Sequence, residues 1–177
     1  MMRFFRRVLR GFRREDGTAS IEFVLAIPVL MTVFMASFES GLLMTRSIML
    51  EQAVDVTIRE LRLGHYTLPD AVKLKKEICG RTTILKECEA NTIVELTRIS
   101  TANWALPNTK AACIDRDQEI QIPDTMVTIL PNDMMLIRVC VRQKLMFPTS
   151  TIGMKIASDS KGGYSLVVAS AFAVEPN

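Results

Sequence analysis

An acidic residue, Glu22, stands at the head of a long apolar run, five positions after Gly17. A carboxylate within a membrane segment costs on the order of 2–3 kcal/mol, so it requires a partner or a function. If a peptidase cuts after Gly17, Thr18 becomes a new N-terminus and Glu22 becomes its fifth residue, with a carboxylate that can pair with the new amine. The sequence therefore predicts cleavage between Gly17 and Thr18, with Glu22 as a processing and assembly residue.

The four cysteines are the second group of residues with chemistry of their own, and all lie in the C-terminal part of the chain. An even number of cysteines confined to one part favours two disulfides formed in an oxidising compartment. Three pairings are open, of which Cys79–Cys88 and Cys113–Cys140 are favoured because each closes a plausible loop. A zinc site would need paired, closely spaced cysteines or nearby histidines, and the chain has a single histidine. We therefore expect no metal.

The sequence offers no pattern typical of an enzyme. It has no nucleophile elbow, phosphate-binding loop, metal-spaced histidine pair or recognisable pair of catalytic carboxylates. With one histidine, little general-base chemistry is available near neutral pH. We expect no catalytic residue and no cofactor.

The residues before Gly17 form a basic leader. Six arginines against two acidic residues give the leader a charge of +4, so that residues 18–177 carry −1 of the total of +3. A basic flank directly before an apolar span holds that end in the cytoplasm and predicts that the C-terminal part lies across the membrane. We expect no nucleic-acid partner, because a basic patch that abuts an apolar span is typical of a topology signal. The arginines are Arg3, Arg6, Arg7, Arg10, Arg13 and Arg14.

The apolar run from Phe23 to Thr45 predicts a membrane-spanning helix. It is about 23 residues long, or roughly 35 Å of helix, which is enough to cross a hydrocarbon core. Pro28 should kink or loosen the helix because it lacks an amide donor. The run is too long for a cleaved secretory signal and has no suitable small-residue site after it. An ordinary single-span anchor, with Glu22 at the cytoplasmic interface, remains an alternative.

Glu39 and Gly41 interrupt the outer end of this run. Glu39 would lie at the outer membrane interface or pair with a partner helix. Gly41 beside it permits close approach of another helix. Together with Pro28, these two residues are the candidates for helix packing.

The spacing of apolar residues predicts that the helix continues beyond the membrane. Four apolar residues recur at intervals of four, four and three, which places them on one helical stripe, and Gly64 is a natural terminator. We therefore divide the chain into a leader (1–17), a transmembrane and amphipathic helix (18–64) and an extracytoplasmic domain (65–177). The stripe consists of Leu50, Val54, Ile58 and Leu61.

The C-terminal domain predicts an α+β fold with an antiparallel sheet. A helix is expected from a cap at Thr67 to Gly80. β-Branched and apolar runs predict strands at 92–99, at 134–141 with an extension toward 146, and at 164–174. Residues 102–131 are expected to form a long loop packed on the sheet and pinned by Trp104 and Cys113.

The segment Gly17-Thr18-Ala19-Ser20-Ile21-Glu22-Phe23, with Pro28, Glu39-Ser40-Gly41 and Arg59, resembles the TadE-like proteins. These are minor pilins, or pseudopilins, of the Flp/Tad type IVb pilus system of bacteria. The resemblance covers roughly residues 16–61. It implies cleavage by a prepilin peptidase after Gly17, before Thr18, in agreement with the reasoning from Glu22. It also implies that Phe23 joins Glu22 as a processing and assembly residue. The major pilin of that system usually has Glu-Tyr and a far shorter chain, so the bulk filament subunit is not implied.

The resemblance implies a minor pilin or pseudopilin that helps to assemble these pili for adhesion and surface colonisation. Its partners would be the prepilin peptidase, other Tad minor pilins and platform proteins, and the cytoplasmic membrane. The protein would cross the inner membrane once, with its N-terminus in the cytoplasm and its C-terminal domain in the periplasm, and incorporation into the pilus is open. The alternative is an uncleaved, single-span binding or sensor module of the periplasm.

Overall fold

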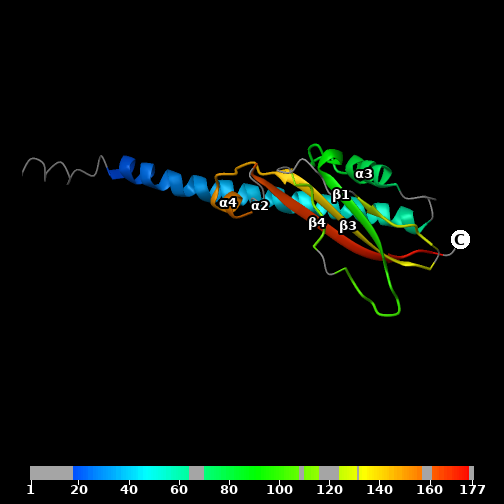
Figure 1. Ribbon diagram of the computed structural model, residues 1–177. Coiled ribbons are helices and arrows are strands. Elements are labelled where there is room, and N and C mark those ends of the chain that lie inside the picture. Colours follow the sequence, from blue (N-terminus) through cyan, green and yellow to red (C-terminus); the bar gives the residue numbers. More distant parts are fainter. Residues whose placement is uncertain are drawn as a thin grey trace, which may run out of the picture.

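The longest element of the computed structural model is the 45-residue helix α2, Thr18–Arg62. The structure describes residues 18–63, 70–107, 110–115, 124–130, 132–156 and 161–175. At the standard rise α2 is roughly 67 Å long. Its first half projects away from the rest of the protein, and its second half lies along a sheet (Figure 1). We call residues 20–38 the projecting segment, and residues 39–62 together with the described residues 70–175 the globular domain.

A four-stranded sheet forms the body of the globular domain. Its strands are β1 (Thr92–Ile99), β2 (Thr125–Met126), β3 (Met134–Lys144) and β4 (Gly163–Ala173). They lie in the order β2-β1-β3-β4, with β1–β3 and β3–β4 antiparallel. The α+β fold and the three long strands agree with the expectation from sequence. The sheet is mixed, however, because the short strand β2 runs parallel to β1 from within the expected loop.

One face of the sheet packs against two helices and forms the core. The second half of α2 and helix α3, Ala71–Gly80, cover this face (Figure 1). The apolar stripe expected on α2 is buried there, as expected from its spacing. Strands present alternate residues to the same face, since side chains of a strand alternate between its two sides. The core includes Leu50, Val54, Ile58 and Leu61 of α2, Leu74 and Ile78 of α3, Val94 and Leu96 of β1, Ile137 and Val139 of β3, and Phe172 of β4.

Part of the opposite face of the sheet, over β1 and β3, is covered by a loop that a disulfide holds in place. Cys113 is bonded to Cys140 of β3, with 5.3 Å between their Cα atoms. Beneath this loop, Arg138 and Glu95 form an ion pair of 2.8 Å between opposite residues of β3 and β1. The main-chain N–H of Ala112 donates to Glu95 as well. The loop thus shields a charged pair that would otherwise face water.

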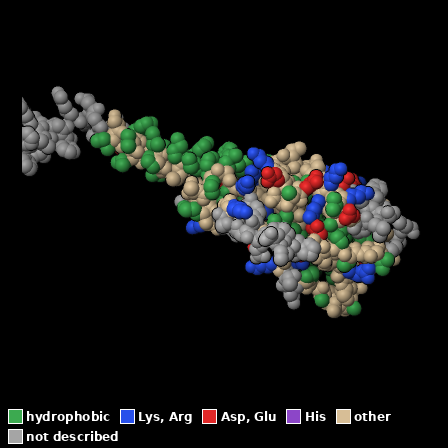
Figure 2. Space-filling model, turned by 45° about the horizontal axis from the view of Figure 1, so that its top comes forward, with side chains coloured by type: hydrophobic (Ala, Val, Ile, Leu, Met, Phe, Trp, Pro, Cys, Tyr) green, Lys and Arg blue, Asp and Glu red, His purple; other side chains and the backbone are tan. Residues whose placement is uncertain are grey.

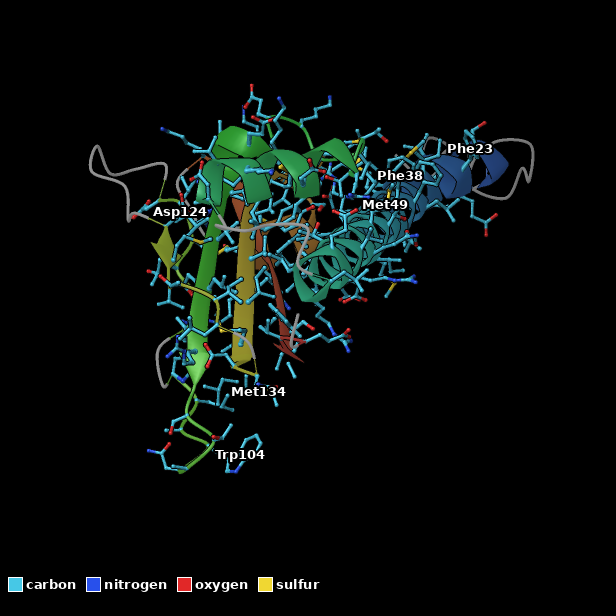
Figure 3. All side chains as sticks on the ribbon, turned by 90° about the vertical axis from the view of Figure 1, so that its right-hand side faces the viewer. Phe23, Phe38, Met49, Trp104, Asp124 and Met134 are labelled. Atoms are coloured by element: carbon cyan, nitrogen blue, oxygen red, sulfur yellow. A yellow bond between two sulfur atoms is a disulfide. The ribbon has the colours of Figure 1, made fainter. Side chains whose placement is uncertain are left out.

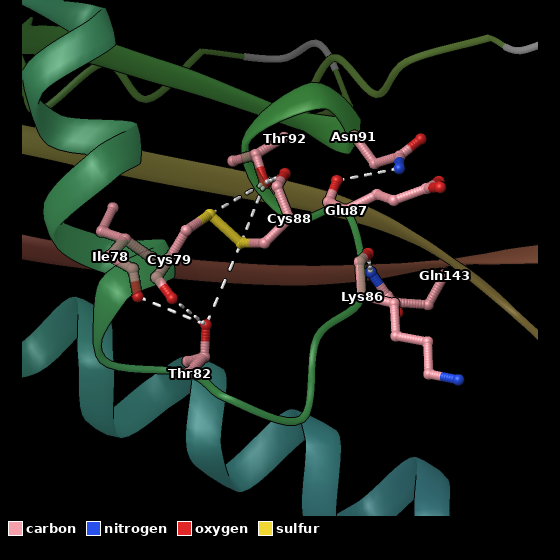
Figure 4. Close-up of a disulfide and its surroundings, with 9 residues drawn as sticks. All are labelled: Ile78, Cys79, Thr82, Lys86, Glu87, Cys88, Asn91, Thr92 and Gln143. Atoms are coloured by element: carbon pink, nitrogen blue, oxygen red, sulfur yellow. Dashed lines mark hydrogen bonds between the residues drawn. A yellow bond between two sulfur atoms is a disulfide. The ribbon is translucent and has the colours of Figure 1, made fainter.

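The second disulfide, Cys79–Cys88, joins the end of α3 to the turn before β1 (Figure 4). Cys88 directly precedes the short 3-10 helix η2, Glu89–Asn91. The hydroxyl of Thr82 lies within hydrogen-bonding distance of the carbonyls of Ile78 and Cys79. The hydroxyl of Thr92 donates to the carbonyl of Cys88 at 2.6 Å. Both disulfides are the pairs that the sequence favoured.

Three local expectations differ from the structure. Helix α3 is capped by Asp70, whose carboxylate accepts from the N–H of Val72, and the expected cap Thr67 lies outside the described residues. Trp104 does not pin the loop, because it is 62% exposed and has a positive φ of 51°. It lies at the far tip of the loop below Met134 (Figure 3). A short helix, α4 (Thr151–Ile156), was not expected and packs against α2.

Candidate functional site

The projecting segment is the most unusual surface of the protein. Its large apolar side chains are mostly exposed, for example Phe23 at 64% and Leu25 at 69%. In water such a surface would be strongly unfavourable, since burying apolar area contributes about 25 cal/mol per Å². Among the described residues, α2 is the one helix long and apolar enough to cross a membrane. The segment covers about 19 residues, or roughly 28 Å, which matches the thickness of a hydrocarbon core.

Four hydroxyl side chains in and just after the projecting segment make hydrogen bonds within helix α2. Thr32 and Ser37 donate to the carbonyls of Val29 and Val33, three and four residues earlier. Ser40 and Thr45 make the same type of bond. In a hydrocarbon environment an unpaired hydroxyl is costly, so these local bonds suit the helix to lipid or to an apolar bundle.

The expected processing residues lie at the start of α2. Helix α2 begins at Thr18, and Gly17 lies outside the described residues. Glu22 is exposed in the second turn, next to the exposed ring of Phe23. A carboxylate close to a helix N-terminus is favourable because the unpaired N–H groups there carry partial positive charge. Glu22 is thus placed to interact with a positive group at the head of the helix.

Pro28 and Gly41 were expected to affect how α2 packs. Helix α2 continues through Pro28, which lies in the exposed part of the segment. A Cβ added at Gly41 would meet no atom within 4 Å, so this glycine is not used for close packing inside the chain. Its role in the approach of a partner helix stays a prediction.

Glu39 joins the projecting segment to the globular domain. Its side chain is fully buried, at 0% exposure. The carboxylate accepts the main-chain N–H of Met146 at 3.2 Å and that of Phe147 at 2.9 Å. The ring of Phe147 also contacts Phe38 edge-on, with 6.1 Å between centroids. Within the described residues Glu39 thus binds the protein's own domain and not a partner helix, while its position at the outer membrane interface stays a prediction.

Arg46, two helical turns further on, makes the second polar contact of this junction. Its Nη1 donates to the carbonyl of Lys144 at 3.0 Å and to the hydroxyl of Tyr164 at 2.8 Å. Burial raises the pKa of Tyr164 above its usual value of 10.0, although the Arg46 guanidinium acts in the opposite direction. The phenol therefore stays neutral at physiological pH and accepts from Arg46. Sequence reasoning singled out Glu39 but missed Arg46 and Tyr164, because their partners are about 100 residues away in the chain.

Removing the Glu39 carboxylate should destabilise the junction. Glu39→Ala leaves two part-buried main-chain N–H groups without their acceptor, and we expect a loss of about 1–2 kcal/mol in the free energy of unfolding. Denaturation of the full chain in detergent micelles, followed by circular dichroism, measures this loss. Glu39→Gln should lose less, since its amide oxygen still accepts. Glu51→Ala, an exposed site on the same helix, is the matched control, and equal stability of Glu39→Ala and Glu51→Ala would contradict the role of Glu39.

An exposed apolar helix that continues into a small, disulfide-bonded α+β domain fits a single-span membrane anchor that carries a folded domain. Comparison with known families makes this more specific. The family model of TadE-like proteins matches residues 17–59 and identifies this segment as TadE-like, consistent with a TadE-like protein of the Tad pilus system. No curated protein and no solved structure matches the chain.

The match begins at Gly17 and ends within the half of α2 that packs on the sheet. It therefore includes the expected processing residues, the projecting segment and both junction residues of α2, Glu39 and Arg46. The sheet and its two disulfides lie outside it.

Proposed function

We propose that this protein is a minor pilin or pseudopilin that takes part in the assembly of Flp/Tad type IVb pili, for adhesion and surface colonisation. The observation that carries the proposal is the position of Glu22 relative to the family match. The match starts at Gly17, helix α2 starts at Thr18, and Glu22 lies in the second turn of an otherwise uncharged, exposed segment. Cleavage after Gly17 would therefore create an amine at the head of a helix that already carries its counter-ion.

The proposed mechanism is the exchange of lipid for neighbouring helices. While the subunit waits in the membrane, the projecting segment is surrounded by lipid, and Glu22 pairs with its own new amine. On assembly, other helices replace the lipid, and Glu22 neutralises the amine of a neighbouring subunit. In an apolar bundle an unpaired charge is strongly unfavourable, so this pairing selects one axial position of each subunit relative to the next.

The disulfides support an extracytoplasmic position of the globular domain. Two disulfides persist in an oxidising compartment, such as the bacterial periplasm, and are rare in the cytosol. The basic leader favours a cytoplasmic N-terminus. We therefore propose a single span of the inner membrane with the domain in the periplasm. The proposed partners are the prepilin peptidase, other Tad minor pilins and the platform proteins, with no catalytic activity and no nucleic-acid partner.

The N-terminus of the native protein tests this proposal. We expect the mature chain to begin at Thr18, because the peptidase removes the leader after Gly17. Mass spectrometry of protein purified from native, piliated cells measures it, with a strain that lacks the prepilin peptidase as control. Retention of residues 1–17 in piliated cells would contradict the proposal and favour the uncleaved membrane-anchored module.

A further inference from the structure

The end of the globular domain that faces the projecting segment has a composition of its own. We call this end the base, and it consists of residues 144–147 at the end of β3 together with α4. Helix α4 lies beside α2, at the level where the projecting segment enters the domain (Figure 1). The base is thus the part of the domain closest to the membrane.

Contacts with α2 fix the height of the base. The N–H groups of Met146 and Phe147 are bound by Glu39, the first residue after the projecting segment. The Phe147 ring lies against Phe38, the last residue of that segment. Because the segment is about as long as a hydrocarbon core is thick, the base lies at the boundary between hydrocarbon and headgroups.

The base exposes large apolar side chains. Met146 is 53% exposed, Met154 is 64% exposed and Ile156 is 36% exposed. On a domain surrounded by water, such a cluster is a candidate interaction surface. At this height, however, the side chains can enter the outer edge of the apolar layer, as amphipathic segments at membrane interfaces do.

Cations accompany these apolar residues. Lys144 and Lys155 are exposed on the base. A cleft of about 230 Å³ next to Met146 is lined by four cations, Arg46, Lys86, Arg142 and Lys144, and by one acidic residue, Glu87. Figure 2 shows blue Lys and Arg side chains where the green projecting segment enters the domain. Apolar tips beside lysines are the arrangement that suits anionic headgroups, since a lysine can keep its ammonium group among phosphates.

We propose that the base docks on the membrane surface and binds anionic phospholipid headgroups, with Met146, Met154 and Ile156 in the outer acyl region. The inference rests on the proposed membrane span and adds a second, reversible membrane contact to it. Docking holds the domain against the lipid before assembly. Leaving the membrane for a pilus then requires that the base be released along with the projecting segment.

A tryptophan placed on the base reports this docking. The chain has a single tryptophan, Trp104, which follows the end of β1 that pairs with Met134, whereas the base follows the opposite end of β3. Trp104→Phe combined with Met154→Trp moves the fluorophore from the far end to the base. We expect lipids brominated near the ester end of the acyl chain to quench the moved indole in vesicles of phosphatidylcholine and phosphatidylglycerol. The unaltered chain should show no quenching of Trp104.

The dependence of quenching on charge distinguishes binding of anionic headgroups from mere proximity of the base to the membrane. In the reporter background, Lys144→Gln and Lys155→Gln should each weaken docking about fivefold, and pure phosphatidylcholine should weaken it further. Lys76→Gln with Lys110→Gln is the matched control, because both lysines are exposed and lie outside the base. Quenching that is equal in both lipids and in all variants would overturn the assignment to anionic headgroups.

Flotation of the same vesicles distinguishes failure of the docking from failure of the anchor. Protein that floats with the vesicles after an alkaline wash is inserted in the membrane. An unquenched indole on the base in that sample therefore overturns the docking alone. A blue-shifted but unquenched indole means that protein covers the base, such as a second copy, and also overturns the proposal. If the protein does not float with the vesicles, both the membrane span and the docking are overturned.

Discussion

Glu22→Leu is expected to abolish surface piliation while the protein is still exported, cleaved and folded. The substitution removes the carboxylate from the second turn of α2 and leaves the globular domain untouched, because residue 22 lies in the exposed projecting segment. If Glu22 only anchored the protein, leucine would be harmless or would improve insertion, since it removes a polar group from the edge of the span. In an assembled bundle, by contrast, an amine would be left without its counter-ion.

The measurement is surface piliation together with co-purification of other pilus components. Glu22→Gln is the milder control, because it keeps the shape and hydrogen-bonding ability of the side chain but removes its charge. We expect it to be impaired as well. Normal piliation by both variants at wild-type protein levels would contradict the assembly role and leave Glu22 as a processing residue at most.

Loss of the Cys113–Cys140 disulfide should cause the larger stability loss of the two disulfides. It spans 27 residues, against 9 for Cys79–Cys88. Loop-closure entropy alone then gives about 3.5 kcal/mol for the longer loop and about 2.5 kcal/mol for the shorter one. Without the bond, the loop is free to move away from the sheet and expose the Glu95–Arg138 ion pair to water. We expect Cys113→Ala with Cys140→Ala to unfold at clearly lower denaturant than Cys79→Ala with Cys88→Ala.

Non-reducing peptide mapping must accompany this comparison. It should find two intramolecular disulfides in the unaltered protein and the remaining one in each double variant. Denaturation of the full chain in micelles then gives the free energies of unfolding. Four free thiols in protein purified without reductant, or the reverse order of stability, would contradict the prediction.

Local patterns in the sequence predict the elements that depend on local physics. The β-branched run at residues 92–99 predicts β1, and the stripe from Leu50 to Leu61 predicts the buried side of α2. In both cases the signal lies within a few residues of the feature, so that one chain is enough to find it. The favoured cysteine pairing is confirmed as well, although the sequence alone left two other pairings open.

Features that depend on distant parts of the chain could not be predicted. Strand β2 consists of two residues and exists because it lies beside β1. The apolar size of Trp104 suggested an anchor, but its place in a turn with positive φ exposes it. For Glu39 the sequence shows a charge that needs a partner, while the partner is the main chain of residues 146 and 147. The apolar helix was therefore predictable from the sequence and the junction was not, while the processing residues at the N-terminal end stay a prediction.

Helix α2 is continuous, so it fixes the rotation of Glu22 about the helix axis as well as its distance from the domain. One helix holds both Glu22 and the core residues of the domain. Its pitch of about 3.6 residues per turn therefore sets the direction of the carboxylate relative to the sheet. An extra residue in the projecting segment would rotate the two by about 100° and shift them by about 1.5 Å. In the proposed assembly, pairing through Glu22 would therefore also determine which side of the domain faces outward. The axial position and the outward face of the subunit would then be selected in one step.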